Sequence, residues 1–225
     1  IELRPTQLVI ATGVSGRPQV PVIPGQDVFA GRQEHSSQHS GEGDHAGQRV
    51  VVVGANNSAH DIAAALWENG AEVTMIQRSS TLIVTAESLR WLQRGLYSEE
   101  ALAAGINTEQ ADLLSAATPY RLVPAMSIPA WDRIREMDAD LYARLSEVGF
   151  RLDFGTDGSG LGMKYLTRAG GYYVDVGASE LVASKQITLC SGVEVEELTT
   201  DSVVLSDGRH LPADLVVYAT GFGPF

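Results

Sequence analysis

The sequence predicts an α/β fold in which a parallel sheet carries helices on both of its faces. The segment 49–53 contains four consecutive valines, which is too apolar for a strand with one face in water and indicates a buried central strand. A helical pattern follows over 58–69, and Gly70 ends it. The segment 72–77 then predicts a second strand, which runs parallel to the first because a helix connects the two.

The stretch from about 84 to 170 is predicted to be mostly helical. Its clearest pattern covers 131–148, where apolar residues recur at spacings of three and four before the stop at Gly149. These apolar residues are Trp131, Ile134, Met137, Leu141, Leu145 and Val148. Such spacing is typical of ordinary core packing, so no cofactor role is assigned to them.

Further strands are predicted towards both ends of the chain. The turn 206–208 (Ser-Asp-Gly) predicts a hairpin between 203–205 and 209–211. Apolar runs predict buried strands over 8–10 and 215–218. Because domain termini usually fray through polar residues, strands this close to both ends indicate a segment of a larger protein.

Composition limits the classes of partner. The net charge of −12 and the pI near 4.7 disfavour binding to nucleic acid or to an anionic membrane surface. The sequence lacks an apolar run of the roughly 20 residues that cross a bilayer, so a cytoplasmic location is expected. The single cysteine, Cys190, cannot form a disulfide or a dithiol within the chain, and its strand-like setting predicts a buried thiol.

A dinucleotide-binding turn is predicted at 54–59, between the first strand and the helix. Gly54 would allow the tight turn, position 56 the backbone approach to a pyrophosphate, and Ala59 the close packing of helix on strand. Asn56 stands where a second glycine is usual; asparagine tolerates a left-handed backbone, although its side chain crowds the approach. This motif alone leaves open a βα turn in an unrelated doubly wound domain.

The end of the second strand predicts which nucleotide is bound. Arg78 stands where an acidic residue would select NAD(H) through the ribose hydroxyls. A guanidinium followed by the hydroxyls of Ser79 and Ser80 instead suits the 2′-phosphate of NADP(H). The alternative is an arginine that is simply exposed at a strand end.

Further motifs carry a family resemblance. The pattern Phe29-x-Gly31-x-x-x-His35 resembles the FxGxxxHxxx fingerprint of the flavin-containing monooxygenases and the related Baeyer–Villiger monooxygenases. The segment GANNSAHDIA, beginning at Gly54, resembles the second dinucleotide motif of that family. Two ATG segments, at 11–13 and 219–221, look like the stretches that connect the two cofactor domains there.

The resemblance implies a domain organisation. Residues 1–47 would be a remnant of an FAD domain and a crossing linker, and 214–225 the return crossing. Residues 48–213 would be a Rossmann-like NADP(H)-binding domain with a helical insertion at about 84–170. This domain would be inserted between two strands of a truncated FAD domain, whose own pyrophosphate motif is absent from the chain.

The resemblance also implies an activity. NADPH would reduce FAD, O2 would form a C4a-(hydro)peroxyflavin, and one oxygen atom would pass to a small organic substrate. The motifs and the resemblance together assign Gly54, Asn56, Asn57, Ser58 and Ala59 to the pyrophosphate, Arg78 and Ser79 to the 2′-phosphate, Thr12, Gly13, Thr220 and Gly221 to close backbone approach at the crossings, and Phe29, Gly31, His35 and Ser36 to the loop between the cofactors. No catalytic acid or base and no metal site is assigned, and the chain alone is not expected to turn over.

Other functions stay open at this stage. A pyridine nucleotide–disulfide reductase shares the two-domain plan but needs a dithiol. A non-enzymatic NADP(H)-binding module would make the fingerprint a coincidence, and an inactive relative would explain the departures at Asn56 and His39. Since His39 replaces the usual aromatic residue, the division between N- or S-oxygenation and Baeyer–Villiger oxidation is left open as well.

Overall fold

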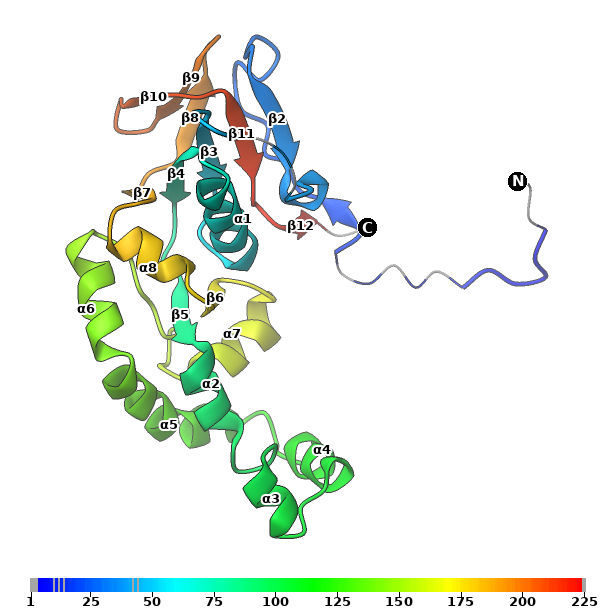
Figure 1. Cartoon of the computed structure of the whole chain (residues 1–225). Coiled ribbons are helices and arrows are strands. Elements are labelled where there is room, and N and C mark those ends of the chain that lie inside the picture. The colour runs from blue at the N-terminus through cyan, green and yellow to red at the C-terminus, as the bar shows by residue number, and fades with distance from the viewer. Residues whose placement is uncertain are drawn as a thin grey trace.

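The computed structural model describes residues 4–9, 11, 13, 15–41, 43 and 45–223 (Figure 1). At its centre lies a five-stranded sheet with the order β2-β11-β3-β4-β7, and every neighbouring pair is parallel. The strands are β2 (Arg32–His35), β3 (Arg49–Val53), β4 (Glu72–Gln77), β7 (Thr188–Ser191) and β11 (Leu215–Tyr218). The predicted parallel sheet is confirmed, and the carboxyl ends of its strands meet at one edge.

Helices cover one face of this sheet. The helix α1 (Asn57–Glu68) follows β3 and packs beside α8 (Ala178–Ala183), which in turn packs beside α6 (Ala139–Glu147). Alternate strand residues point to this face, as the pleat of a strand requires. They include Val50, Val52, Val73, Met75, Leu215 and Val217, which share one apolar cluster with Ala59, Ala63 and Leu66 of α1. Burial of this cluster fixes the position of α1 on the sheet.

The opposite face corrects the prediction of helices on both sides. It is covered by a three-stranded antiparallel sheet of β8 (Val195–Leu198), β9 (Ser202–Leu205) and β10 (His210–Pro212). Val51 and Val216 of the central sheet share an apolar cluster with Val203 and Leu205 of β9. The connection between β7 and β11 therefore contains a three-stranded meander, in the region where short strands and a hairpin were predicted. The predicted hairpin is confirmed by the antiparallel pairing of β9 with β10.

Between β4 and β7 the chain leaves the sheet and forms a mostly helical body, as predicted. It contains β5 (Leu82–Thr85), α2 (Ala86–Gln93), α3 (Glu99–Ala103), α4 (Thr108–Ala116), α5 (Val123–Met137), α6, α7 (Leu161–Arg168) and β6 (Tyr172–Asp175). Strands β5 and β6 form a parallel pair of their own, and Figure 1 shows α3 and α4 farthest from the central sheet. Within the described residues, every helix falls short of the length and apolar character needed to cross a bilayer.

The predicted helix over 131–148 is two helices, because the chain turns at Asp138. The buried carboxylate of Asp138 accepts two hydrogen bonds from Thr85, one from the backbone N at 3.2 Å and one from Oγ1 at 3.0 Å. It accepts a third from Oγ of Ser88 at 2.8 Å. These bonds satisfy donors at the start of α2. Apolar spacing alone did not reveal this break, since the apolar stripe continues on both sides of it.

The strand predicted over 8–10 is wrong for Leu8 and Val9. Leu8 and Val9 are exposed and do not pair with any described strand. Ile10 lies outside the described residues. Instead, β1 (Arg17–Pro18) pairs antiparallel with β12 (Phe222–Gly223). The predicted domain division stays a prediction; the central sheet takes strands from all three of the predicted segments.

We predict that Asp138→Ala lowers the free energy of unfolding by about 2–4 kcal/mol, because several buried donors lose their acceptor. Urea denaturation measures this change. Asp140→Ala is the control: its carboxylate is exposed and pairs with Arg144 on the surface, so its removal is expected to cost less than about 1 kcal/mol. Equal losses in the two variants would contradict the role given to Asp138.

Candidate nucleotide site at the carboxyl edge of the sheet

The turn after β3 requires a glycine at position 54. Gly54 has φ of +136°, and a Cβ atom built on it would lie 2.5 Å from the carbonyl oxygen of Ala219. The backbone N of Gly54 donates to the carbonyl of Ile76 at 3.0 Å, and the N of Ala219 donates to the carbonyl of Val53 at 2.9 Å. The turn is thus held between the ends of β4 and β11, where a side chain would not fit.

The N-terminus of α1 is open. Asn56 is its N-cap residue, with φ of −106° and ψ of −166°, so the left-handed backbone expected for it is wrong; Gly54 takes the positive φ instead. The Asn56 side chain makes no capping bond, and the first turn of α1 contains no acidic residue. The helix dipole and the first N–H groups are therefore available to an anion.

The other residues of this motif have different surroundings. Asn57 Oδ1 accepts a bond from the backbone N of Val174 at 3.0 Å, which fixes β6 to the start of α1. Ser58 is exposed, whereas Ala59 is fully buried where the helix meets the sheet. The small size of Ala59 thus serves close packing, as expected from the motif.

Arg78 and Ser79 lie at the same edge, directly after β4, and both are exposed. Within the described part of the chain, the Arg78 guanidinium makes no hydrogen bond or ion pair. The residues on either side are fixed: Gln77 Oε1 accepts from the N of Arg151 at 2.8 Å, and the N of Thr81 donates to the carbonyl of Arg151 at 2.9 Å. The short turn therefore presents a free cation next to the open end of α1.

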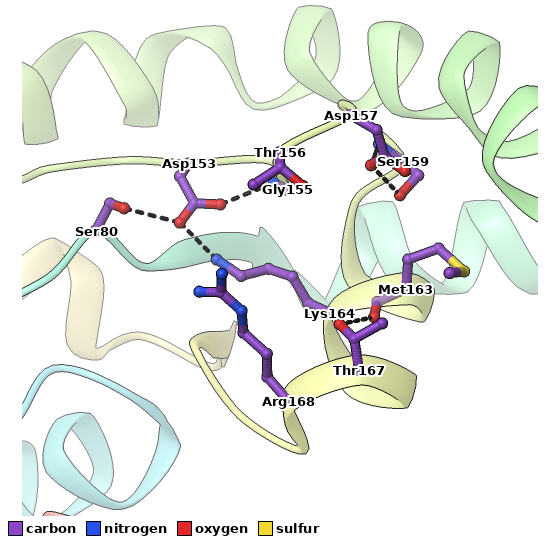
Figure 2. Close-up of a pocket in the computed structure, with 10 residues that line it drawn as sticks. All are labelled: Ser80, Asp153, Gly155, Thr156, Asp157, Ser159, Met163, Lys164, Thr167 and Arg168. Carbon is purple, nitrogen blue, oxygen red and sulfur yellow. Dashed lines mark hydrogen bonds and ion pairs between the residues drawn. The ribbon is translucent and has the colours of Figure 1, made fainter.

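A cavity of about 390 Å³ lies beside this turn (Figure 2). It is lined by Ser80, Asp153, Gly155, Thr156, Asp157, Ser159, Met163, Lys164, Thr167 and Arg168. The buried Lys164 Nζ pairs with Asp153 Oδ2 at 2.6 Å. Burial pushes the pKa of Asp153 upward, but the hydrogen bonds from Lys164, the N of Gly155 and Ser80 outweigh it and hold this pKa below its ordinary value.

Sequence reasoning missed this cavity, although one signal was present. Lys164 and Arg168 are four residues apart in α7, so they lie on one face of the helix. Arg168 is exposed and makes no bond to any residue that the structure describes, and Figure 2 shows its guanidinium near the Lys164 amine. The distance in sequence from Ser80 to Asp153 hid the other half of the cavity.

The fingerprint residues are spread along β11. Gly31, with the Phe29 ring against it, lies beside Asp214 just before the strand begins, whereas His35 pairs with Tyr218 at its carboxyl end and Ser36 follows. A Cβ on Gly31 would lie 2.5 Å from the buried ring of Phe29, so glycine is needed for this ring to pack. His35 is buried; its Nε2 donates to the carbonyl of Gly221 at 2.8 Å, and its Nδ1 accepts from the N of Ser37 at 3.1 Å. Ser36, half-buried, begins the short 3-10 helix η1 (Ser36–Gln38).

The second ATG segment lies beside the first crossing. Thr220 Oγ1 donates to the carbonyl of Gln19 at 2.5 Å, and the N of Gln19 donates to the carbonyl of Gly221 at 3.0 Å. Of the first ATG segment, Thr12 lies outside the described residues, and Gly13 is exposed with φ of +65°. The structure therefore brings Thr220 and Gly221 together with Gly54 and His35, and leaves Gly13 exposed.

His60 lies one turn behind the open end of α1 and is fully buried. Its Nδ1 donates to the carbonyl of Asn56 at 3.2 Å, its ring stacks on Tyr173 at 4.1 Å, and its Nε2 has no partner within the described residues. Burial lowers the pKa of His60 to about 4, although the bond to Asn56 acts in the opposite direction. The imidazole is thus neutral at pH 7.

Comparison with known proteins identifies the class. The family profile described as pyridine nucleotide-disulphide oxidoreductase matches residues 2–118, which is more than half of the 225 residues. The chain therefore belongs to this family.

Individual relatives are monooxygenases, in agreement with the resemblance seen in the motifs. The chain is 26% identical over 215 residues to indole-3-pyruvate monooxygenase YUCCA1 of Oryza sativa subsp. japonica, covering 96% of this chain and 46% of that protein. It is 27% identical over 216 residues to probable indole-3-pyruvate monooxygenase YUCCA10 of Arabidopsis thaliana, covering 96% and 48%. The chain spans about half the length of the curated relatives it matches.

Solved structures share the fold. Cyclohexanone monooxygenase from Rhodococcus sp. Phi1 bound to NADP+ superposes with a TM-score of 0.61 at 18% identity, covering 94% of this chain and 45% of that chain. An oxidized steroid monooxygenase bound to NADP gives a TM-score of 0.61 at 19% identity, covering 94% and 46%.

We predict that stability falls as the pH drops from about 6.5 towards 4, because His60 is neutral in the folded chain and protonates near pH 6.5 once unfolded. The expected loss is about 3 kcal/mol over this window. Urea denaturation measures the free energy of unfolding at pH 7 and at pH 4.5. The difference between the two values should be smaller for His60→Leu than for the wild type. His210→Leu removes an exposed histidine and serves as the control. The same pH dependence in wild type and His60→Leu would rule out His60 as the source.

Proposed function

We propose that the chain is the NADP(H)-binding part of a flavin-dependent monooxygenase that transfers one oxygen atom from O2 to a small organic substrate. The observation that carries the proposal is that the open N-terminus of α1 and the Arg78 guanidinium, which has no partner among the described residues, lie at the same edge of the sheet. The relatives named as indole-3-pyruvate monooxygenases support the reaction class. The fold neighbours bound to NADP support the choice of cofactor.

The residues around Gly54 fit a dinucleotide pyrophosphate. A Cβ at this position would clash with the carbonyl of Ala219, so the turn keeps its backbone bare at the point where the phosphates would approach. The first-turn N–H groups of α1 would then donate to the phosphates. The Asn56 side chain is exposed at the N-cap position. Its Oδ1 forms only a long contact, 3.5 Å, with Thr81 Oγ1, so the side chain can turn aside.

Arg78 supports NADP(H) over NAD(H). Its guanidinium has no competing carboxylate among the described residues, and the adjacent Ser79 is exposed as well. A 2′-phosphate placed at this turn would accept charge-assisted bonds from Arg78 and a further bond from the Ser79 hydroxyl. NADH, which lacks this phosphate, would lose these contacts.

FAD would bind on the side of the crossings. A bound flavin would supply the electron transfer and the reaction with O2. The fit that this chain offers is limited to backbone at the crossings: Gly221 has φ of +80° with open space where a Cβ atom would lie, and Thr220 is fixed to Gln19. The fingerprint residue His35 holds the Gly221 carbonyl and would thereby orient the crossing between the two cofactors.

Cys190 argues against disulfide reduction by residues of this chain. It is the single cysteine of the sequence, and it lies buried in β7. Burial raises the pKa of its thiol, although the Arg209 Nη1 donates to its Sγ at 3.4 Å. A thiol kept in this protonated form does not act as a nucleophile, so monooxygenation remains the better supported reaction.

We predict that Arg78→Ala weakens NADPH binding by about ten- to a hundredfold and leaves NADH binding unchanged, since only NADPH has the phosphate that loses a charged partner. Isothermal titration of the 225-residue chain with each nucleotide measures both affinities. Arg133→Ala, which removes an exposed arginine of α5, should bind both nucleotides like the wild type. If the wild type bound neither nucleotide, the proposed nucleotide site would be wrong; equal binding of both would remove the role of Arg78 and the preference for NADP(H).

A further inference from the structure

The turn that presents Arg78 is held by a partly buried network beside the cavity, which includes no residue of the family motifs. Ser80 Oγ donates to Asp153 Oδ2 at 2.8 Å, and the same oxygen accepts from Lys164 Nζ at 2.6 Å. Asp153 Oδ1 accepts from the backbone N of Gly155 at 2.7 Å. Figure 2 shows Ser80 and Lys164 converging on this carboxylate from two sides.

The backbone on both sides of the turn is fixed to the same segment. Gln77 and Thr81 both bond to the backbone of Arg151, and the N of Asp153 donates to the carbonyl of Thr81 at 3.3 Å. Between these anchors, the Ser80 hydroxyl is the one described side-chain link from the turn itself to Asp153. Arg78 and Ser79 are left at the tip of the turn.

The geometry points to Asp153 and Ser80 as positioning residues for the 2′-phosphate contact: Asp153, oriented by Lys164, holds Ser80 and so fixes the direction in which Arg78 and Ser79 face the nucleotide. This inference rests on the proposed function. The single O–H of Ser80 donates its hydrogen bond to Asp153, so the hydroxyl serves the turn and does not donate to a phosphate. A fixed turn loses less conformational entropy on binding, which strengthens the contact with the one nucleotide that has the phosphate.

The main test is Ser80→Ala in the 225-residue chain, with NADPH and NADH titrated separately. Loss of the link should weaken NADPH binding by about three- to tenfold and leave NADH binding unchanged. Ser80→Thr keeps the hydroxyl and should restore the wild-type ratio of the two affinities. Thr167→Ala is the matched control, because Thr167 lines the same cavity but bonds to Met163 within α7.

A second variant separates positioning from direct contact by Ser80. The double substitution Asp153→Ala with Lys164→Met removes the ion pair without leaving a buried charge unpaired. It should lower the preference for NADPH as Ser80→Ala does, although Ser80 is present. Adding Ser80→Ala to this variant should then have no further effect, since both changes break the same link.

The outcomes distinguish this inference from the proposed function. A wild-type preference for NADPH that is lost in Arg78→Ala, but kept in Ser80→Ala, would overturn the positioning role and leave the proposed function in place. Equal weakening of NADPH and NADH in Ser80→Ala would assign Ser80 a general structural role and overturn the inference as well. A wild type without any preference for NADPH would overturn both.

Discussion

The close contact between the turn at Gly54 and the carbonyl of Ala219 is the constraint on which the rest of the site depends. Because Gly54 has no side chain, the backbone at the end of β11 can lie directly against the turn that begins α1. This approach sets the second ATG segment beside the open helix end, and the bond from His35 to Gly221 brings the last residue of the fingerprint there too. One bare backbone position thus lies where the nucleotide turn, the second ATG segment and His35 meet at one edge of the sheet.

Charge is distributed at this edge in a consistent way. The first turn of α1 has no acidic residue, Arg78 has no partner among the described residues, and the cation of Lys164 is balanced by Asp153. A cation at the same sheet edge as a helix N-terminus favours an anionic ligand there, although the chain as a whole has a net charge of −12.

The sequence predicted the parts of the fold whose signals are local. The valine run of β3, the helix α1 and the strand β4 follow from patterns of fewer than fifteen residues with a glycine at each turn. The hairpin of β9 and β10 was predicted from its turn, but its place as the cover of the second sheet face was not, because local patterns do not show which face a hairpin packs against. The break at Asp138 was missed because a carboxylate that caps another helix leaves no mark on apolar spacing.

The candidate site shows the same division. Gly54, Ala59 and Arg78 could be located from the motif, because each position has a fixed place relative to a strand or helix end. Asp153 and Lys164 could not, because their relation to Ser80 exists only after a long helical body has folded back onto the sheet edge. The backbone of Asn56 was predicted wrongly, since the positive φ belongs to the glycine two residues earlier.

The antiparallel pairing of β1 with β12 has a consequence for how such a unit can be combined with other chains. Because the entering and leaving strands are hydrogen-bonded neighbours, residues 19–221 project from a base only one strand pair wide. In a longer polypeptide, the segments before β1 and after β12 would lie as close together as the two strands of a hairpin. Holding them there would therefore cost little conformational entropy.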